Sequence, residues 1–192
     1  MNNYQYFEYI ILSKLLRKGN SYIVQKMREM GVKIGENTHI FSNIALSEPY
    51  LISIGDNCTI STNVSFITHD ASVGVIMGRE NYSDLCGKIV IGNNCFIGNN
   101  SIILYGTTIA NNTIIAAGSV VTKSVIEPGC IIGGNPAKII GNVEKFKDKY
   151  KHNFLALHGR NASERKHLIL SSGKLIERQN SKQETAGAIF KE

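Results

Sequence analysis

Residues 91–121 read IGNNCF-IGNNSI-ILYGTT-IANNTI-IAAGSV-V, a six-residue block repeated without interruption. Each block begins with a β-branched aliphatic residue, and these residues are Ile91, Ile97, Ile103, Ile109, Ile115 and Val121. A helix repeats every 3.6 residues and a strand every two, so neither alone produces a period of six. A short strand followed by a tight corner does. The stretch therefore predicts a coil of stacked turns that bury their aliphatic residues against one another.

The residues between the aliphatic positions fit the corners of such a coil. Asparagine pairs recur at residues 93–94, 99–100 and 111–112, and asparagine adopts turn and left-handed conformations more readily than most residues. A small residue also stands four positions after each aliphatic one. We expect these small side chains to point into a narrow interior; they are Cys95, Ser101, Thr107, Thr113 and Ser119.

The same phase extends toward the N-terminus, with two interruptions. It includes Ile34 and Ile40, shifts, resumes over residues 54–66, and shifts again before Ile91. Each shift indicates residues that leave the coil. We therefore predict a coil over residues 32–143 with a loop excursion over residues 70–88. The flanks have helical patterns, which predict an N-terminal helical cap over residues 1–31 and a C-terminal helical extension over residues 144–192.

Composition excludes several classes of protein. The net charge of +6 lies in the flanks, and residues 144–192 carry eleven Lys or Arg against six Asp or Glu. Because this charge is mixed in sign, solvated helix faces are favoured over nucleic-acid binding, although contact with an anionic membrane surface stays open. The four cysteines lack a C-x-x-C pair, which favours reduced thiols in the cytoplasm. The apolar stretches are too short for a transmembrane segment.

Three further segments, together with the repeat, resemble the hexapeptide-repeat acyltransferases over about residues 32–143. They are FITHD at residues 66–70, AAGSVVTK at 116–123 and GNPAK at 134–138. The resemblance is nearest to the branch that acetylates sugars in capsule or lipopolysaccharide synthesis, alongside galactoside, maltose and xenobiotic acetyltransferases. It implies an all-β core, a left-handed parallel β-helix (the hexapeptide-repeat solenoid) with flanking α-helices at both ends. It also implies a homotrimer that uses acetyl-CoA as acetyl donor and needs no metal.

His69 is the candidate catalytic residue. It lies at the edge of the regular coil, just before the excursion, and a long loop on a regular scaffold usually carries function. The resemblance implies that His69 is a general base, which takes a proton from an acceptor hydroxyl or amine during direct attack on the acetyl thioester. Imidazole suits this role because its ordinary pKa is near neutrality. The next residue, Asp70, either orients the imidazole or begins the turn, and the sequence leaves both open.

The resemblance also assigns binding residues. The cofactor-binding candidates are Asn99, Ala117, Thr122, Lys123 and Lys138. A lysine suits a phosphate, and a small residue such as Ala117 suits close approach of the pantetheine arm. The candidate acceptor contacts are Asn43 and Glu48, in the first interruption, and Asp70. One departure is Phe96, which stands where the family often has tryptophan near the catalytic groove.

Taken together, the sequence predicts an acetyl-CoA-dependent O-acetyltransferase acting on a sugar or surface-polysaccharide intermediate. Two alternatives share the same apparatus: acetylation of a xenobiotic such as an antibiotic, and N-acetylation of an amino sugar. A metal hydrase on this fold is disfavoured because it needs three histidine ligands, and only His39 and His69 lie in the coil. A non-catalytic scaffold is disfavoured because it leaves His69 and the two lysine motifs unexplained.

Overall fold

A computed structural model of the chain describes residues 19–42, 47–78, 80, 83–176 and 178. The chain divides into two compact units, residues 1–145 and 146–192. Within the described residues, no helix has both the length and the apolar character needed to cross a membrane.

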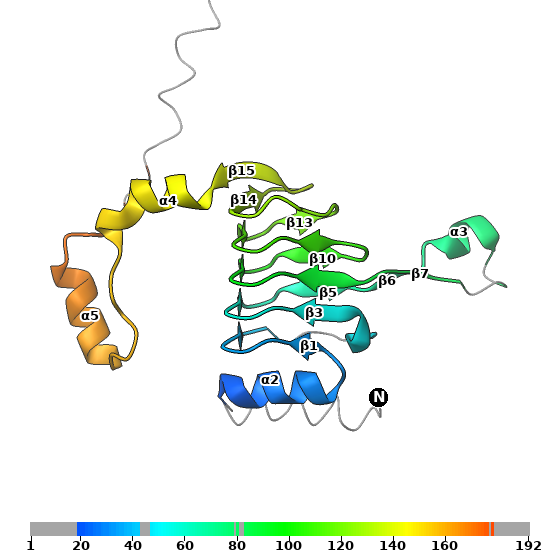
Figure 1. Ribbon diagram of the computed structural model, residues 1–192, viewed down its shortest axis with the longest axis horizontal. Coiled ribbons are helices and arrows are strands. Elements are labelled where there is room, and N and C mark those ends of the chain that lie inside the picture. Colours follow the sequence, from blue (N-terminus) through cyan, green and yellow to red (C-terminus); the bar gives the residue numbers. More distant parts are fainter. Residues whose placement is uncertain (1–18, 43–46, 79, 81–82, 177, 179–192) are drawn as a thin grey trace, which may run out of the picture. The chain divides into compact units, whose positions relative to one another are not determined.

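The first unit contains the predicted coil, in which the described strands form three sheets that the chain visits in a fixed order (Figure 1). The first sheet contains β1 (Lys33–Ile34), β3 (Ile52–Ile54), β8 (Ile89–Ile91) and β11 (Thr108–Ile109). The second contains β2 (His39–Ile40), β4 (Thr59–Ile60), β9 (Phe96–Ile97), β12 (Ile114–Ile115), β14 (Cys130–Gly133) and β15 (Lys138–Asn142). The third contains β5 (Ser65–Ile67), β10 (Ile102–Leu104) and β13 (Val120–Val121). Strands from successive turns pair in parallel, and only β14 and β15 pair antiparallel in these sheets.

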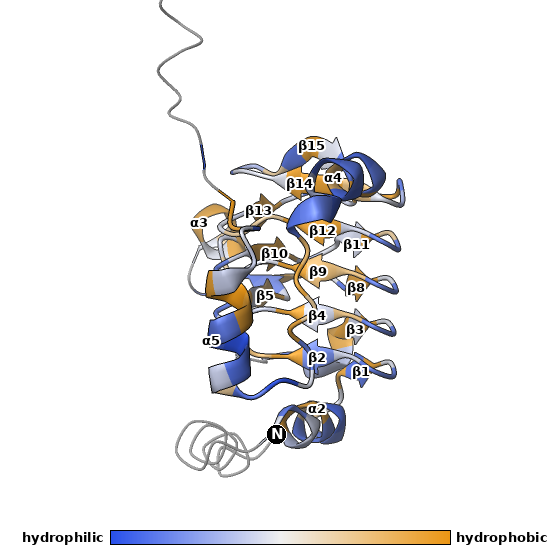
Figure 2. Ribbon diagram, turned by 90° about the vertical axis from the view of Figure 1, so that its left-hand side faces the viewer, coloured by the Kyte–Doolittle hydropathy of each residue, from blue (hydrophilic) through white to orange (hydrophobic). Residues whose placement is uncertain are grey.

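The aliphatic residues of the repeat form the core, which confirms their predicted inward phase. Ile97, Ile103 and Ile115 are fully buried, and the other repeat positions are nearly so. The small residues four positions later are buried as well, and Ser101 and Thr113 each donate a hydrogen bond of 2.8 Å to a carbonyl of their own corner. Figure 2 shows hydrophobic residues along the strands and hydrophilic residues at the outer corners.

The corners explain both the small residues and the asparagines of the repeat. A Cβ atom on Gly98 would lie 2.5 Å from the backbone nitrogen of Ala117, so only glycine fits where the next turn passes. Several corner asparagines adopt left-handed φ angles between 55° and 59°, and these are Asn37, Asn57, Asn63, Asn94, Asn100 and Asn112. Their side chains also connect neighbouring turns; the Asn94 amide donates to Asn112 Oδ1 at 2.6 Å.

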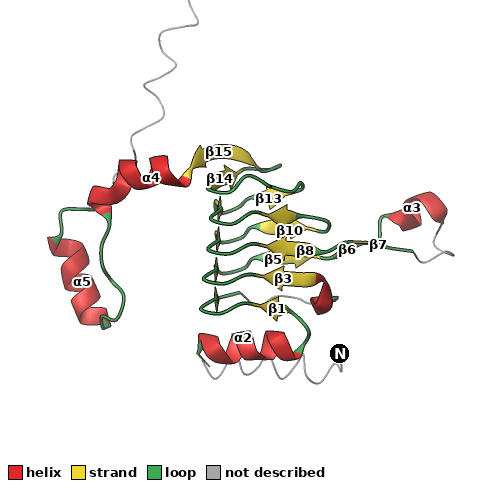
Figure 3. Ribbon diagram, viewed as in Figure 1, coloured by secondary structure: helices red, strands yellow, loops and turns green. Residues whose placement is uncertain are grey.

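Helix α2 (Asn20–Glu29) packs against the first turn of the coil (Figure 3). Val24 and Met27 are its buried residues, and the Asn20 amide donates to the Ile40 carbonyl at 2.8 Å. The helix therefore covers apolar groups and a backbone carbonyl that the end of the coil would otherwise expose. The first 18 residues of the predicted N-terminal cap lie outside the described part of the chain.

The described residues of the second unit form helices joined by turns and loops. Helix α4 (Val143–Tyr150) runs across the division between the units and is followed by the 3₁₀ turn η2 (Lys151–Asn153) and helix α5 (Ala162–Ser171). Asn161 and Glu164 cap α5 reciprocally, each side chain accepting the other's backbone N–H at 3.0 Å.

Candidate active site

The candidate catalytic residue lies at the base of an arm that leaves the coil after β5. Strand β6 (His69–Asp70) carries the chain outward, helix α3 (Val73–Met77) follows, and strand β7 (Leu85–Cys86) returns antiparallel to β6 (Figure 1). His69 pairs with Cys86 in this short ladder. The arm corresponds to the excursion that the sequence predicts, and it rejoins the coil at β8.

The His69 ring is held by Glu48, a residue 21 positions earlier. Glu48 immediately precedes the 3₁₀ turn η1 (Pro49–Leu51), in the first interruption of the repeat. Its Oε2 atom lies 2.9 Å from His69 Nδ1, and the Thr68 hydroxyl donates to the same oxygen. The Glu48 side chain is 23% exposed and the His69 side chain 36%. Among the described residues none forms a hydrogen bond with His69 Nε2, so that nitrogen is the one available for proton transfer.

The two groups shift each other's ionisation. Burial opposes the charge on Glu48, but the hydrogen bonds from Thr68 and His69 outweigh it and lower the pKa of the carboxyl group. The hydrogen bond to Glu48 and its negative charge raise the pKa of His69, with smaller contributions from Asp84 and Asp70. An ionised carboxylate only accepts hydrogen bonds. Neutral His69 therefore carries its proton on Nδ1 and its lone pair on Nε2.

Asp70 has different partners. Its Oδ1 accepts the Ser72 backbone N–H at 2.8 Å and its Oδ2 accepts the Tyr105 hydroxyl at 3.2 Å. These bonds, that of the Ser72 backbone first, lower the pKa of Asp70. Of the two roles left open by the sequence, the structure has Asp70 begin the turn, while the imidazole is oriented by Glu48. Asn43, the third candidate acceptor contact, lies outside the described residues.

The cofactor-binding candidates flank the third sheet. The C-terminal ends of its three strands are aligned, because Leu104 pairs with Ile67 and Val121 pairs with Ile103. Thr122 directly follows Val121 and therefore lies level with Leu104 and Ile67. Asn99 and Ala117 lie near the N-terminal ends of these strands, in corners of successive turns, where the Gly118 N–H donates to the Asn99 carbonyl at 2.8 Å. The Asn99 side chain accepts the backbone N–H of Thr62 at 3.2 Å. These cofactor-binding candidates therefore lie at both ends of the strands of the third sheet.

The two candidate lysines lie in one pocket although they are 15 positions apart. Lys123 and Lys138 line a cavity of about 300 Å³ together with Ala137, Ile132 and Glu127. The antiparallel pairing of β14 with β15 produces this arrangement because it places Lys138 opposite Gly133, at the last turn of the coil. Two ammonium groups at one cavity suit a ligand with phosphate groups.

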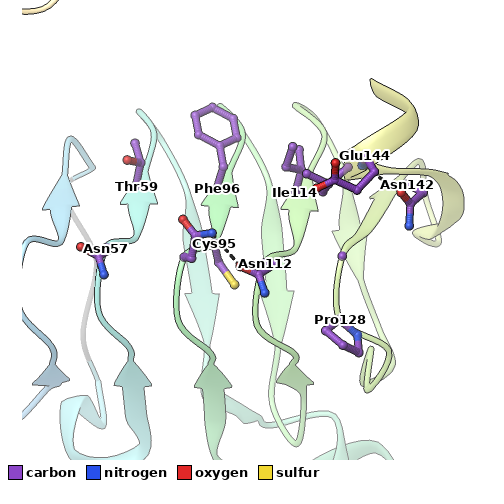
Figure 4. Close-up of a pocket in the computed structure, with 12 residues that line it drawn as sticks. Asn57, Thr59, Cys95, Phe96, Asn112, Ile114, Pro128, Asn142 and Glu144 are labelled. Atoms are coloured by element: carbon purple, nitrogen blue, oxygen red, sulfur yellow. Dashed lines mark hydrogen bonds between the residues drawn. The ribbon is translucent and has the colours of Figure 1, made fainter. Parts of the chain in front are cut away.

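A second and larger groove, of about 700 Å³, lies over the second sheet (Figure 4). Its lining includes Asn57, Asn112, Thr59 and Phe96, the last 43% exposed. It contains neither His69 nor the candidate lysines, so within one chain Phe96 lies on a different face of the coil from the His69–Glu48 pair. Within this groove the Asn94 amide donates to Asn112 Oδ1, and we assign the groove no chemistry.

Comparisons with known proteins bear on these sites. Residues 88–123 match the family described as "Bacterial transferase hexapeptide (six repeats)", and residues 52–68 match "Hexapeptide repeat of succinyl-transferase". The chain is 42% identical to Protein CapG of Staphylococcus aureus over 164 residues, which cover 84% of this chain and 94% of CapG. It is 35% identical to galactoside O-acetyltransferase of Escherichia coli K12 over 123 residues, 63% of this chain and 57% of that protein.

Solved structures similar to the chain include two acetyltransferases. A maltose O-acetyltransferase from Clostridium difficile 630 has a TM-score of 0.56 and 26% identity, covering 73% of this chain and 84% of that one. The acetyltransferase VCA0836 of Vibrio cholerae, solved with acetyl-CoA, has a TM-score of 0.59 and 24% identity, covering 72% of this chain and 85% of that one. The second similarity concerns the fold alone.

Proposed function

The chain belongs to the hexapeptide-repeat acyltransferase family, and we propose that it transfers the acetyl group of acetyl-CoA to a hydroxyl of a sugar or surface-polysaccharide intermediate. The observation that carries this proposal is the His69–Glu48 pair at the base of the arm. It supplies an oriented base just after strand β5 of the third sheet, and two lysines line one cavity at the last turn of the coil.

The proposed reaction is a direct transfer. His69 Nε2 takes the proton of the acceptor hydroxyl while that oxygen attacks the carbonyl carbon of the thioester. Glu48 holds the Nδ1 proton and stabilises the imidazolium that forms. The tetrahedral intermediate then expels the CoA thiolate, which takes up the proton from His69. The products are the acetyl ester and CoA with its thiol, and the base returns to its starting state.

The proposed donor site runs along the third sheet. Neighbouring strands are about 4.8 Å apart, so Thr122, two strands from Ile67, lies roughly 10 Å from the level at which the chain leaves for His69. This direction leads from the base to Lys123 and Lys138, which we propose bind phosphate groups of the nucleotide end. Asn99 and Ala117, near the N-terminal ends of the strands, are the proposed contacts of the pantetheine arm.

The names of two relatives support a sugar acceptor, since one is a galactoside O-acetyltransferase and the other a maltose O-acetyltransferase. A left-handed winding of the coil, assembly as a homotrimer and a cytoplasmic location, where acetyl-CoA is available, belong to the same proposal. So does the division into a cap over residues 1–31, a catalytic coil over 32–143 and an extension over 144–192.

An acceptor screen tests the proposal. Purified protein and acetyl-CoA are incubated with maltose, p-nitrophenyl galactoside, glucosamine and chloramphenicol, and products are identified by mass spectrometry. We expect a gain of one acetyl group on a sugar and its loss in mild base, as an ester requires. A base-stable amide on glucosamine alone would indicate N-acetylation, and acetylated chloramphenicol alone would indicate the xenobiotic branch. No acetylation of any acceptor would contradict the proposal.

A further inference from the structure

The dipeptide Tyr105-Gly106 lies beside the base of the arm. It directly follows strand β10, whose last residue, Leu104, pairs with Ile67 at the end of β5. The turn that contains Tyr105 and Gly106 therefore passes next to Thr68 and His69, where the chain leaves the coil. Both strands of the arm contact this dipeptide, each by a different kind of interaction.

The outgoing strand is held by the Tyr105 side chain. Its hydroxyl donates to Asp70 Oδ2 at 3.2 Å, and Asp70 Oδ1 accepts the Ser72 backbone N–H at 2.8 Å. Both carboxylate oxygens are thus occupied, one by the coil and one by the arm. Burial and the bond to Asp70 raise the pKa of Tyr105, so its hydroxyl keeps the proton that this bond requires.

The returning strand is held by backbone packing. A Cβ atom on Gly87 would lie 2.5 Å from the backbone nitrogen of Gly106, so the two glycines are in close contact. The Gly87 N–H also donates to the Thr68 carbonyl at 3.0 Å. Gly106 has a φ angle of +73°, a left-handed conformation that favours glycine. One dipeptide of the coil therefore fixes both strands of the arm.

We propose that Tyr105 is a positioning residue that, through Asp70, fixes the arm relative to the coil and thereby determines how the sugar acceptor is presented to His69. The inference rests on the proposed function. Glu48 fixes the imidazole ring of His69, while the backbone of His69 belongs to the arm as the first residue of strand β6. An acceptor that reaches Nε2 must therefore lie against the base of the arm. Loss of the hydrogen bond from Tyr105 leaves the His69 ring paired with Glu48, but it lets the base of the arm beside that ring move.

The matched variants are Tyr105→Phe and Tyr150→Phe. Each removes one phenol oxygen. Tyr150 serves as the control because it lies on helix α4, where its ring contacts Phe146. The kinetic measurement is acetyl transfer to maltose and to p-nitrophenyl galactoside, with calorimetry for the dissociation constant of acetyl-CoA. For Tyr105→Phe we expect kcat/KM for the acceptor to fall about three- to tenfold, the size of effect expected from the loss of one hydrogen bond of ordinary strength. The affinity for acetyl-CoA should stay within about twofold, because only an acceptor contact is disturbed.

A double variant checks the route through Asp70. If Tyr105 acts through this carboxylate, Tyr105→Phe combined with Asp70→Asn should be no more than about twofold worse than the more impaired single variant, since partners in one interaction are non-additive. Multiplied losses would contradict this route. Acceptor kinetics of Tyr105→Phe equal to those of Tyr150→Phe would overturn the proposal. An equal loss of acetyl-CoA affinity would indicate general structural damage, and would overturn it as well.

Hydrogen exchange gives a measurement that needs no acceptor. The Ser72 and Gly87 amides bond within the base of the arm, so Tyr105→Phe should accelerate their exchange about threefold or more relative to Tyr150→Phe. Unchanged exchange would refute the positioning role even if the protein acetylates nothing tested. Conversely, absence of transfer by the unmodified protein would refute the proposed function while leaving the exchange result to decide the role of Tyr105.

Discussion

Glu48→Gln tests the electrostatic link between this carboxylate and the proposed base. The change keeps the length of the side chain and an oxygen that accepts the Nδ1 proton, but removes the negative charge 2.9 Å from the ring. An opposite charge at contact raises the pKa of a base because it stabilises the protonated form. The hydrogen bond to Glu48 and its charge are the largest causes that raise the pKa of His69, so the substitution should lower that pKa, by an amount that solvent screening of the 36% exposed side chain limits.

The sign of the effect follows from which form of His69 is active. The neutral ring is the base, so kcat/KM rises with pH through the pKa of His69, and Glu48 raises that pKa. Glu48→Gln should therefore move the acid limb of the profile to lower pH. The plateau should fall about threefold or more, since a weaker base transfers protons more slowly.

The assay is kcat/KM for acetyl transfer, measured from about pH 5 to pH 9, the range in which histidine titrates. Asp70→Asn is the discriminating control, because Asp70 bonds to Ser72 and Tyr105 and contributes little to the His69 pKa. Glu36→Gln removes an exposed carboxylate that pairs with Arg28, and it should leave the pH profile of kcat/KM unchanged. An acid limb that stays in place in Glu48→Gln, or that moves further in Asp70→Asn, would refute the reasoning.

Three further predictions concern the core, the donor site and the arm. Ile97→Asp places a carboxylate in the fully buried core and should lower the unfolding free energy by at least about 3 kcal/mol, whereas Phe96→Asp on the exposed face should cost far less; equal melting temperatures would contradict the inward phase. Lys123→Ala and Lys138→Ala should each raise KM for acetyl-CoA about three- to tenfold with kcat little changed, and a change confined to the acceptor KM would refute their assignment. N-ethylmaleimide should inactivate the enzyme at exposed Cys86, opposite His69, and Cys86→Ser should resist; equal inactivation of both would place the reactive thiol elsewhere.

The regular part of the fold could be predicted because its determinants are local and repeated. Each turn requires an aliphatic residue inside and a small residue where the next turn passes, and both requirements recur every six positions. Gly98 against Ala117 and the left-handed Asn94 show the physical origin of two of these preferences. A pattern of this kind specifies the register of many strands from one short segment.

The pairing at the candidate site could not be predicted in the same way. Glu48 and His69 lie 21 positions apart, each beside an interruption of the repeat, and a period says nothing about side chains where it breaks. The sequence nevertheless contains one signal for the turn beside His69. The block at residues 103–108, ILYGTT, has Leu104-Tyr105 where three other blocks have a small residue followed by asparagine and the fourth has two alanines. That departure marks the turn that contacts the arm.

The direct test of the central claim is His69→Ala, assayed for acetyl transfer together with acetyl-CoA binding by calorimetry. Removing a general base typically costs about a hundred- to ten-thousand-fold in rate. Because His69 lies at the base of the arm and outside the buried core, the variant should fold and bind acetyl-CoA nearly as the unmodified protein does. A fall of kcat in that range with binding preserved is the predicted result. Turnover retained within about threefold would contradict the assignment of His69 as the base.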